Sequence, residues 1–250
     1  MESHQVLINE TLISYATASK GEKSLIFLHG WRSNKEAWLP IAERMQGAGF
    51  RMFFIDLPGF GASETPKNPY TLNDYAKTVR IFIEKLSLQN CVVIGHSFGA
   101  RVTIKLAAEN PNLLQKLVLV ASGGNRTPYI GLKAMLAKII KPFFMPRFMA
   151  SFRKKLYSLI GAEDYLATPK LQATLLNIVN ENLDPLMPCI KTKTLVIWGN
   201  ADTTAPISYG KHMATCIPNA RLKIIKGAGH YCFQEKPEKF TILLTAFLKH

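Results

Sequence analysis

Short apolar runs alternate with longer amphipathic segments along most of this 250-residue chain, and this alternation constrains the fold more than any other feature. The short runs are rich in β-branched and aromatic residues and are apolar throughout, as strands are when both faces of a sheet are covered. The longer segments carry apolar residues at helical spacing. Parallel strands joined by crossover helices require this order. The sequence therefore predicts an α/β fold with a mostly parallel, doubly wound sheet of eight strands.

The first two expected strands form a hairpin around a turn at Asn9 and Glu10. Strands are expected at 6–8, 12–15, 25–28, 52–55, 92–94, 117–120, 195–198 and 222–225. Crossover helices are expected near 35–47, 71–86, 98–109, 206–216 and 237–249. Thr71, with Asp74 three residues later, has the pattern of a capping box that opens the second of these helices.

One connection breaks the alternation, because residues 123–188 join two strands through far more chain than a crossover needs. This length predicts a helical cap, or lid, inserted over the sheet. The rest of the chain, 1–122 and 189–250, is then one core domain of ordinary size.

The run Gly95-His96-Ser97-Phe98-Gly99 lies directly between an expected strand and an expected helix. This is the context of a nucleophile elbow, a sharp turn that exposes a serine hydroxyl above the sheet. The turn is so tight that the residues two before and two after the serine must be small, as Gly95 and Gly99 are. Ser97 is therefore the candidate nucleophile, and the amino end of the following helix favours negative charge beside it.

A serine hydroxyl needs a neighbouring base, and the base needs a carboxylate that fixes its tautomer. His230 follows the last expected strand in a glycine-containing loop and is the candidate base. Asp202 follows the preceding strand and is the candidate acid, in the chain order Ser, Asp, His that this kind of site uses. Asp56 also follows a strand, but it precedes the elbow in the run DLPGFGAS, which indicates turn chemistry and a structural role.

A tetrahedral intermediate at Ser97 requires hydrogen-bond donors for its oxyanion. The backbone N–H of Phe98 is one candidate, and that of Trp31, after the strand that ends in His29-Gly30, is the other. His29 and Gly30 are candidates for the substrate pocket, with a plain strand-to-loop exit as the alternative.

Five motifs in this order resemble the α/β-hydrolase superfamily: HGW at 29–31, DLPGFGAS at 56–63, GHSFG at 95–99, GNAD at 199–202 and GAGH at 227–230. Within it the chain is similar to small capped serine carboxylesterases and carbon–carbon bond hydrolases, which implies no metal and no organic cofactor. Relatives that act as dehalogenases or epoxide hydrolases have an aspartate where this chain has Ser97.

The leading hypothesis is a serine hydrolase that cleaves carboxylic esters with an apolar acyl or aromatic group through an acyl-serine intermediate. The alternatives are hydrolysis of a carbon–carbon bond with the same triad, and a ligand receptor of the same fold with slow turnover. A receptor would show tight ligand binding with negligible turnover, whereas fast hydrolysis of small esters would favour the enzyme.

The expected cap has an unusual composition, because the chain from 110 to 162 is basic and rich in Phe and Met, with no acidic residue before Glu163. Phe143, Phe144 and Phe148 are candidates for the substrate pocket. The basic positions are Lys116, Arg126, Lys133, Lys138, Lys141, Arg147, Arg153, Lys154 and Lys155. They predict contact with an anion: a substrate carboxylate, an acidic carrier protein or an anionic membrane surface. The alternatives are a solvated basic face, with the Phe and Met residues packed against the sheet.

The whole chain has 31 Lys and Arg against 17 Asp and Glu, a net charge of +14. No nucleic-acid-binding motif accompanies this charge, so we do not expect a nucleic acid partner. The first residues lack the pattern of a signal peptide, and a cytoplasmic location is expected. No CxxC pair occurs, so reduced thiols are expected, with Cys232 a buried core cysteine.

Overall fold

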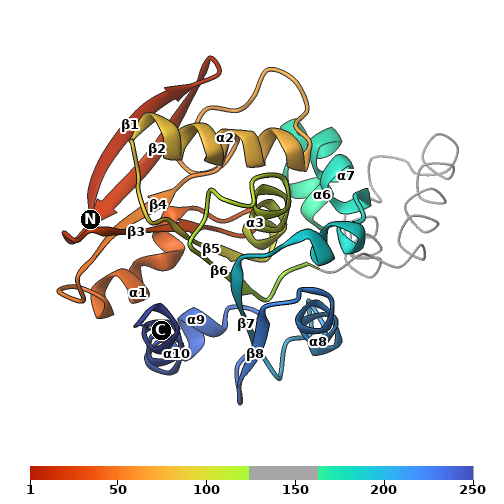
Figure 1. The fold of residues 1–250 in the computed structure, drawn as a ribbon. Helices are drawn as coiled ribbons and strands as arrows, with labels where there is room; N and C mark the ends of the chain where they lie inside the picture. Colours follow the sequence, from red (N-terminus) through yellow and green to blue (C-terminus); the bar gives the residue numbers. More distant parts are fainter. Residues whose placement is uncertain (124–162, 250) are drawn as a thin grey trace, which may run out of the picture.

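A computed structural model describes residues 1–123 and 163–249 of the chain. Eight strands form one sheet in the order β1-β2-β4-β3-β5-β6-β7-β8, as Figure 1 shows. The first two strands pair antiparallel with each other, and β2 pairs antiparallel with β4. All later neighbours are parallel. The predicted mostly parallel α/β sheet is confirmed.

Every expected strand is present, and most are longer than the apolar run that predicted them. The strands are β1 Glu2–Ile8, β2 Thr11–Ala18, β3 Lys23–Leu28, β4 Phe50–Ile55, β5 Val92–His96, β6 Lys116–Val120, β7 Lys193–Gly199 and β8 Ala220–Ile225. The extra residues include polar ones at strand ends, such as Lys116 and Lys193, which hydrophobicity alone does not mark as strand. Asn9 and Glu10 both have positive φ, as a two-residue hairpin turn requires.

All five expected crossover segments are helical. They are η1 Lys35–Trp38 with α1 Leu39–Arg44, α2 Leu72–Lys85, α3 Phe98–Glu109, α8 Ile207–Cys216 and α10 Pro237–Lys249, joined by the short α9 Cys232–Glu235. The capping box at Thr71 and Asp74 is present. Among the helices of the described chain, none combines the length and the apolar character needed to cross a bilayer.

The helices cover both faces of the sheet. On one face α2 packs against α3, and α8 packs on β7 and β8. Gly210 allows this last contact, because a Cβ there would lie 2.6 Å from the Trp198 ring. On the other face α1 lies against α9 and α10, and the Trp38 ring stacks on Phe233 with centroids 4.0 Å apart. The apolar core therefore continues on both sides of the strands, which explains their unbroken hydrophobic runs.

The described end of the long connection is helical, with α6 Glu163–Ala167, η3 Pro169–Leu171, α7 Gln172–Asn180 and η4 Asp184–Cys189. Several hydrogen bonds and ion pairs join it to the core, among them those of Thr174 and Arg101. Thr174 Oγ1 accepts a hydrogen bond from the Tyr70 backbone N–H at 3.0 Å. The Arg101 guanidinium on α3 donates to the carbonyl oxygens of Ile178 and Glu181.

Residues 124–162 lie outside the described chain, and with them Phe143, Phe144, Phe148 and the basic positions from Arg126 to Lys155. The expectation that Lys116 belongs to the basic cap is wrong, because Lys116 opens β6 in the core. A lysine can occupy such a strand position because its alkyl chain packs against apolar neighbours while its ammonium group reaches polar ones.

Candidate functional site

The turn between β5 and α3 has the geometry that its glycines predict. Ser97 has φ +49° and ψ −106°, a conformation that a residue with a side chain rarely adopts. A Cβ on Gly95 would lie 2.4 Å from the Gly99 carbonyl oxygen. A Cβ on Gly99 would lie 2.5 Å from the Leu28 carbonyl oxygen. Both positions therefore exclude any side chain, and Ser97 is held on a strained turn at the carboxyl end of β5.

Asp202 and His230 meet at the carboxyl ends of β7 and β8. His230 Nδ1 lies 2.8 Å from Asp202 Oδ2, so the ring donates Nδ1–H to the carboxylate and leaves Nε2 as the basic nitrogen. The other carboxylate oxygen accepts from the backbone N–H groups of Thr204 and Ala205, at 2.9 and 2.8 Å. The Asp202 side chain is fully buried. The carboxylate is thus fixed in position and points at one nitrogen of the ring.

The two loops that carry Asp202 and His230 touch each other through backbone. A Cβ on Gly199 would lie 2.2 Å from the Ala228 carbonyl oxygen, and the same oxygen accepts from the Ala201 N–H at 2.9 Å. Glu235 on α9 accepts from the Gly229 N–H at 2.7 Å. Gly199 of GNAD is therefore required for the close approach of the two loops.

His96 joins the serine turn to the histidine loop, a role that sequence reasoning missed. Its Nε2–H donates to the His230 carbonyl oxygen at 3.0 Å, and the two ring centroids are 4.8 Å apart. Burial, and next the neighbouring His230, lower the pKa of His96 to about 3, so the ring is neutral. The sequence feature that could have indicated this role is the position of His96 directly before Ser97. Among the described residues, Ser97 Oγ forms no direct hydrogen bond with His230. In enzymes without bound substrate, the hydrogen bond between nucleophile and base is often long and shortens only in the substrate complex.

The two amides expected to bind an oxyanion flank this turn. Phe98 opens α3, so its N–H has no partner within the helix. Trp31 follows β3, and its ring lies 5.3 Å from that of Phe98 and 4.8 Å from that of Phe60. Among the described residues, neither N–H is used by another group.

His29 lies behind the site, not on its surface. The side chain is fully buried, its Nδ1–H donates to the Gly30 carbonyl at 2.7 Å, and its Nε2 accepts from the Leu57 N–H at 3.0 Å. Desolvation lowers its pKa to about 4. Both ring nitrogens are occupied and the side chain is shielded from solvent, so the structure places His29 behind the expected substrate pocket and not in its lining. Gly30 is buried too, and a Cβ there would lie 2.9 Å from His96 Nδ1.

Asp56 is used within its own loop. Its carboxylate is fully buried and accepts from Lys35 Nζ at 2.6 Å, from the Lys35 backbone N–H at 2.7 Å and from the Ala62 N–H at 2.9 Å. These bonds join the two ends of the run DLPGFGAS to each other and to Lys35. The structural role expected for Asp56 agrees with this set of partners.

Cys232 is fully buried, and desolvation raises the pKa of its thiol to about 12. It is a core residue of α9 with no thiolate character. Across residues 1–123 and 163–249, no group of three or more His, Cys, Asp and Glu side chains is arranged to hold a metal ion.

Comparison with known proteins gives the same picture as the fold. The sequence model of the family described as "alpha/beta hydrolase fold" matches residues 23–170, more than half of the chain. The chain belongs to this family. Membership places the chain among hydrolases, and the matched residues include the HGW, DLPGFGAS and GHSFG motifs.

Individual relatives of this hydrolase are distant. It is 23% identical over 262 residues to 2-hydroxy-6-oxononadienedioate/2-hydroxy-6-oxononatrienedioate hydrolase 2 of Pseudomonas putida, covering 95% of this chain and 92% of that protein. It is 26% identical to AB hydrolase superfamily protein YisY of Bacillus subtilis, covering 90% and 91%. The solved esterase of Exiguobacterium antarcticum superposes with a TM-score of 0.80 at 21% identity, covering 100% of both chains. The enol-lactonase of Burkholderia xenovorans superposes with a TM-score of 0.79 at 22% identity, covering 99% and 100%.

Proposed function

We propose that this hydrolase cleaves carboxylic esters through an acyl-serine intermediate, with Ser97 as nucleophile, His230 as base and Asp202 as the residue that orients the base. The observation that carries the proposal is the 2.8 Å bond between His230 and the buried Asp202, on loops that meet the strained Ser97 turn through His96. A serine hydroxyl requires a neighbouring base to act as a nucleophile, and an imidazole oriented by a buried carboxylate can serve as that base.

In the proposed acylation step, His230 Nε2 takes the proton from Ser97 as Oγ attacks the ester carbonyl. The carbonyl oxygen becomes an oxyanion that accepts hydrogen bonds from the Trp31 and Phe98 N–H groups. His230 then gives the same proton to the departing alkoxide, and the alcohol leaves. Asp202 stabilises the imidazolium throughout without itself taking the proton.

In the proposed deacylation step, a water molecule loses a proton to His230 Nε2 and attacks the acyl carbon. The second oxyanion is held by the same two amides. Its collapse breaks the bond to Ser97 Oγ, which recovers the proton from His230, and the carboxylic acid leaves. No other reactant enters either step, so the proposal requires no cofactor.

The substrate is proposed to carry an apolar acyl or aromatic group. Support comes from aromatic rings beside the two amides: the Trp31 ring packs edge to face with Phe60 and with Phe98, and Phe60 and Phe98 are also in contact. We further propose that residues 123–188 form a cap domain above the core of 1–122 and 189–250. The contacts of Thr174 and of Arg101 described above support that division.

A second candidate is hydrolysis of a carbon–carbon bond in a dienedioate. The support is that several similar proteins, including those of Pseudomonas, are named as hydrolases of 2-hydroxy-6-oxononadienedioate. The identities are 23–24%, a range in which family members differ in substrate.

The test is a panel of p-nitrophenyl esters from acetate to palmitate, assayed beside 2-hydroxy-6-oxononadienedioate with wild type and Ser97→Ala. Ester hydrolysis that falls to background in Ser97→Ala supports the proposal, and the chain length with the highest kcat/KM measures the pocket. Turnover of the dienedioate without turnover of any ester would contradict ester hydrolysis and support carbon–carbon bond hydrolysis instead. Tight binding with negligible turnover of every substrate would point instead to a receptor of this fold.

A further inference from the structure

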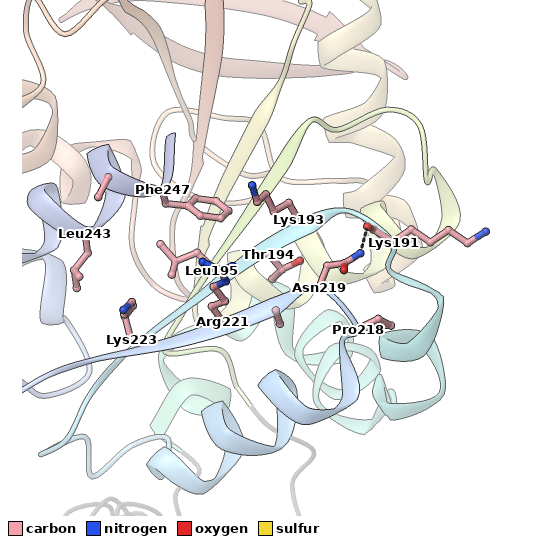
Figure 2. A pocket seen from close by; sticks show the side chains of 12 residues that line it. Lys191, Lys193, Thr194, Leu195, Pro218, Asn219, Arg221, Lys223, Leu243 and Phe247 are labelled. Atoms are coloured by element: carbon pink, nitrogen blue, oxygen red, sulfur yellow. Dashed lines mark hydrogen bonds between the residues drawn. The ribbon is translucent and has the colours of Figure 1, made fainter. Parts of the chain in front are cut away.

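A cleft of about 710 Å³ lies at the outer edge of the sheet, between β8, the start of β7 and α10 (Figure 2). It is lined by the amino ends of both strands, from Lys193 and Ala220 onward. Asp202 and His230 lie past the carboxyl ends of the same strands. Since β7 has seven residues, the two places are separated by roughly 20 Å along the sheet.

The pairing of β7 with β8 gathers cationic side chains on one sheet face. Positions two apart on a strand share a face, so Lys193 and Leu195 of β7 lie together. Leu195 is opposite Arg221, and Ile197 is opposite Lys223. Lys193, Arg221 and Lys223 therefore project from the same face, and Lys191 extends outward at one end of the group (Figure 2).

The lining of the cleft is positively charged. All four cationic side chains line the cleft, and no described carboxylate does. Among the described residues, Lys191, Arg221 and Lys223 form no ion pair. Like charges this close repel one another, and a bound anion relieves the repulsion. The cleft therefore favours a negatively charged ligand.

Lys116 on β6, the strand next to β7, adds to the positive charge near the cleft. It is opposite Lys193 on the neighbouring strand, and its ammonium group donates to the carbonyl oxygens of Phe247 and Leu248 at 2.8 and 3.0 Å. Burial, together with the charges of Lys193 and Lys23, lowers its pKa. By donating to these carbonyl oxygens near the end of α10, Lys116 also offsets part of the negative partial charge at that helix end.

The floor of the cleft is apolar. Leu195 from the sheet and Leu243, Ala246 and Phe247 from α10 line it. A volume of this size is typical of sites for small ligands. A free inorganic anion would use the cationic rim and leave the floor in water, whereas an anion with a hydrocarbon or aromatic group covers both.

We propose that this cleft, the basic cleft, binds small amphiphiles that carry a carboxylate, phosphate or sulfonate group, at a second site separate from Ser97. The anionic group lies between Lys193, Arg221 and Lys223, and the apolar group lies on Leu195, Leu243 and Phe247. Leu195 is buried, and Leu243 and Phe247 are half-buried, which favours a single molecule entering the cleft over a flat membrane surface.

Isothermal titration with octyl phosphate tests the proposal. The first variant is Arg221→Gln with Lys223→Gln, and its control is Lys20→Gln with Lys77→Gln, an equal charge change at exposed positions elsewhere. The second is Ala246→Glu, which puts a carboxylate into the cleft, and its control is Ala48→Glu, the same change at an exposed position between α1 and β4. Loss of two charge-assisted contacts, or an added negative charge, should raise the Kd about tenfold or more. Both controls should stay within about twofold of wild type.

Three comparisons complete the experiment. Octyl phosphate should bind at least about tenfold more tightly than inorganic phosphate, because the floor adds apolar burial. Raising NaCl to 0.5 M should weaken binding, because salt screens the rim. Turnover of p-nitrophenyl butyrate should be unchanged in all four variants, which separates this site from the proposed function.

The proposal is overturned if octyl phosphate binds equally to wild type and to both cleft variants. It is also overturned if inorganic phosphate binds as tightly as octyl phosphate. Sedimentation with phosphatidylglycerol vesicles that depends on Arg221 and Lys223, without binding of octyl phosphate, would make this a membrane-facing patch instead.

Discussion

Two buried aspartates follow strands of this sheet, and their partners separate their roles. Asp202 accepts one bond from His230 and two from backbone N–H groups. Asp56 accepts from Lys35 and Ala62 and reaches no imidazole in the described chain. At the scale of single residues, the difference is one of partner and not of burial, since both carboxylates are shielded from water.

Asp202→Asn should fold normally and lose up to about four orders of magnitude in kcat, because an amide can hold His230 in the wrong tautomer. Asp56→Asn should instead lower the free energy of unfolding by about 1–3 kcal/mol, because it removes the buried carboxylate partner of Lys35 and leaves only Glu36, 3.3 Å from the ammonium group. Urea unfolding and kcat per folded molecule for p-nitrophenyl butyrate measure both effects. If Asp56→Asn lost more turnover per folded molecule than Asp202→Asn, the assignment of the acid would be wrong.

His96 is expected to act as a positioning residue through its bond to the His230 carbonyl. His96→Ala removes this donor and should lower kcat by about tenfold or more with little change in KM, since the substrate contacts remain. His96→Gln can place an N–H near the position of Nε2 and should recover part of the loss. Equal kcat in wild type and His96→Ala, or no recovery in the Gln variant, would assign His96 a packing role only.

At the scale of elements, the close approach of β5, α3 and β3 makes the serine turn possible. Gly99 brings the first turn of α3 against the carbonyl oxygens of Leu28 and His29, and its N–H donates to His29 O at 3.1 Å. Further along the helix, Arg101 bonds to the described end of the long connection. One helix therefore follows the serine turn at its amino end and also bonds to the described end of the long connection.

Gly99→Ala should destabilise the fold by several kcal/mol, because the new Cβ meets backbone atoms that cannot move independently. Gly229→Ala is the matched control, since the nearest atom to its Cβ is the flexible carboxylate of Glu235 at 3.1 Å. The comparison is made by thermal unfolding of the soluble fractions. Similar midpoints for the two variants would contradict the packing argument at the turn.

At the scale of the whole molecule, the excess of +14 is concentrated in particular places. The sequence places one basic segment between Arg126 and Lys155, outside the described chain, and the structure forms another at the basic cleft. In contrast, the two histidines nearest the serine turn, His29 and His96, are held neutral by burial.

These two histidines predict how the whole molecule responds to acid. Their pKa values are lowered to about 4 and about 3, below the 6.5 of an unfolded chain. Between these limits the unfolded state binds protons that the folded state does not, so stability is complete above pH 6.5 and falls as the pH drops toward 4. Each histidine contributes up to about 1.4 kcal/mol per pH unit. Urea unfolding at pH 7, 6 and 5 measures the slope, which should be shallower in His96→Gln; an equal slope in that variant would contradict the assignment.

The sequence by itself determined the element order, the hairpin and the serine turn. These features depend on periodicity and on local turn chemistry, which neighbouring residues carry: Gly95 and Gly99 bracket Ser97, and Thr71 with Asp74 opens α2. It also determined the candidate pair Asp202 and His230, because both follow strands whose carboxyl ends must meet at one edge of a parallel sheet.

Only the tertiary structure decided what depends on residues distant in the chain. It buried His29 behind the site, gave His96 a bond to the His230 loop, and moved Lys116 from the expected cap into β6. It also aligned Lys193 with Arg221 and Lys223 on one face, through the register of β7 with β8. The physical reason is that strand register and side-chain burial are set by packing between segments far apart in sequence, and no local pattern records them.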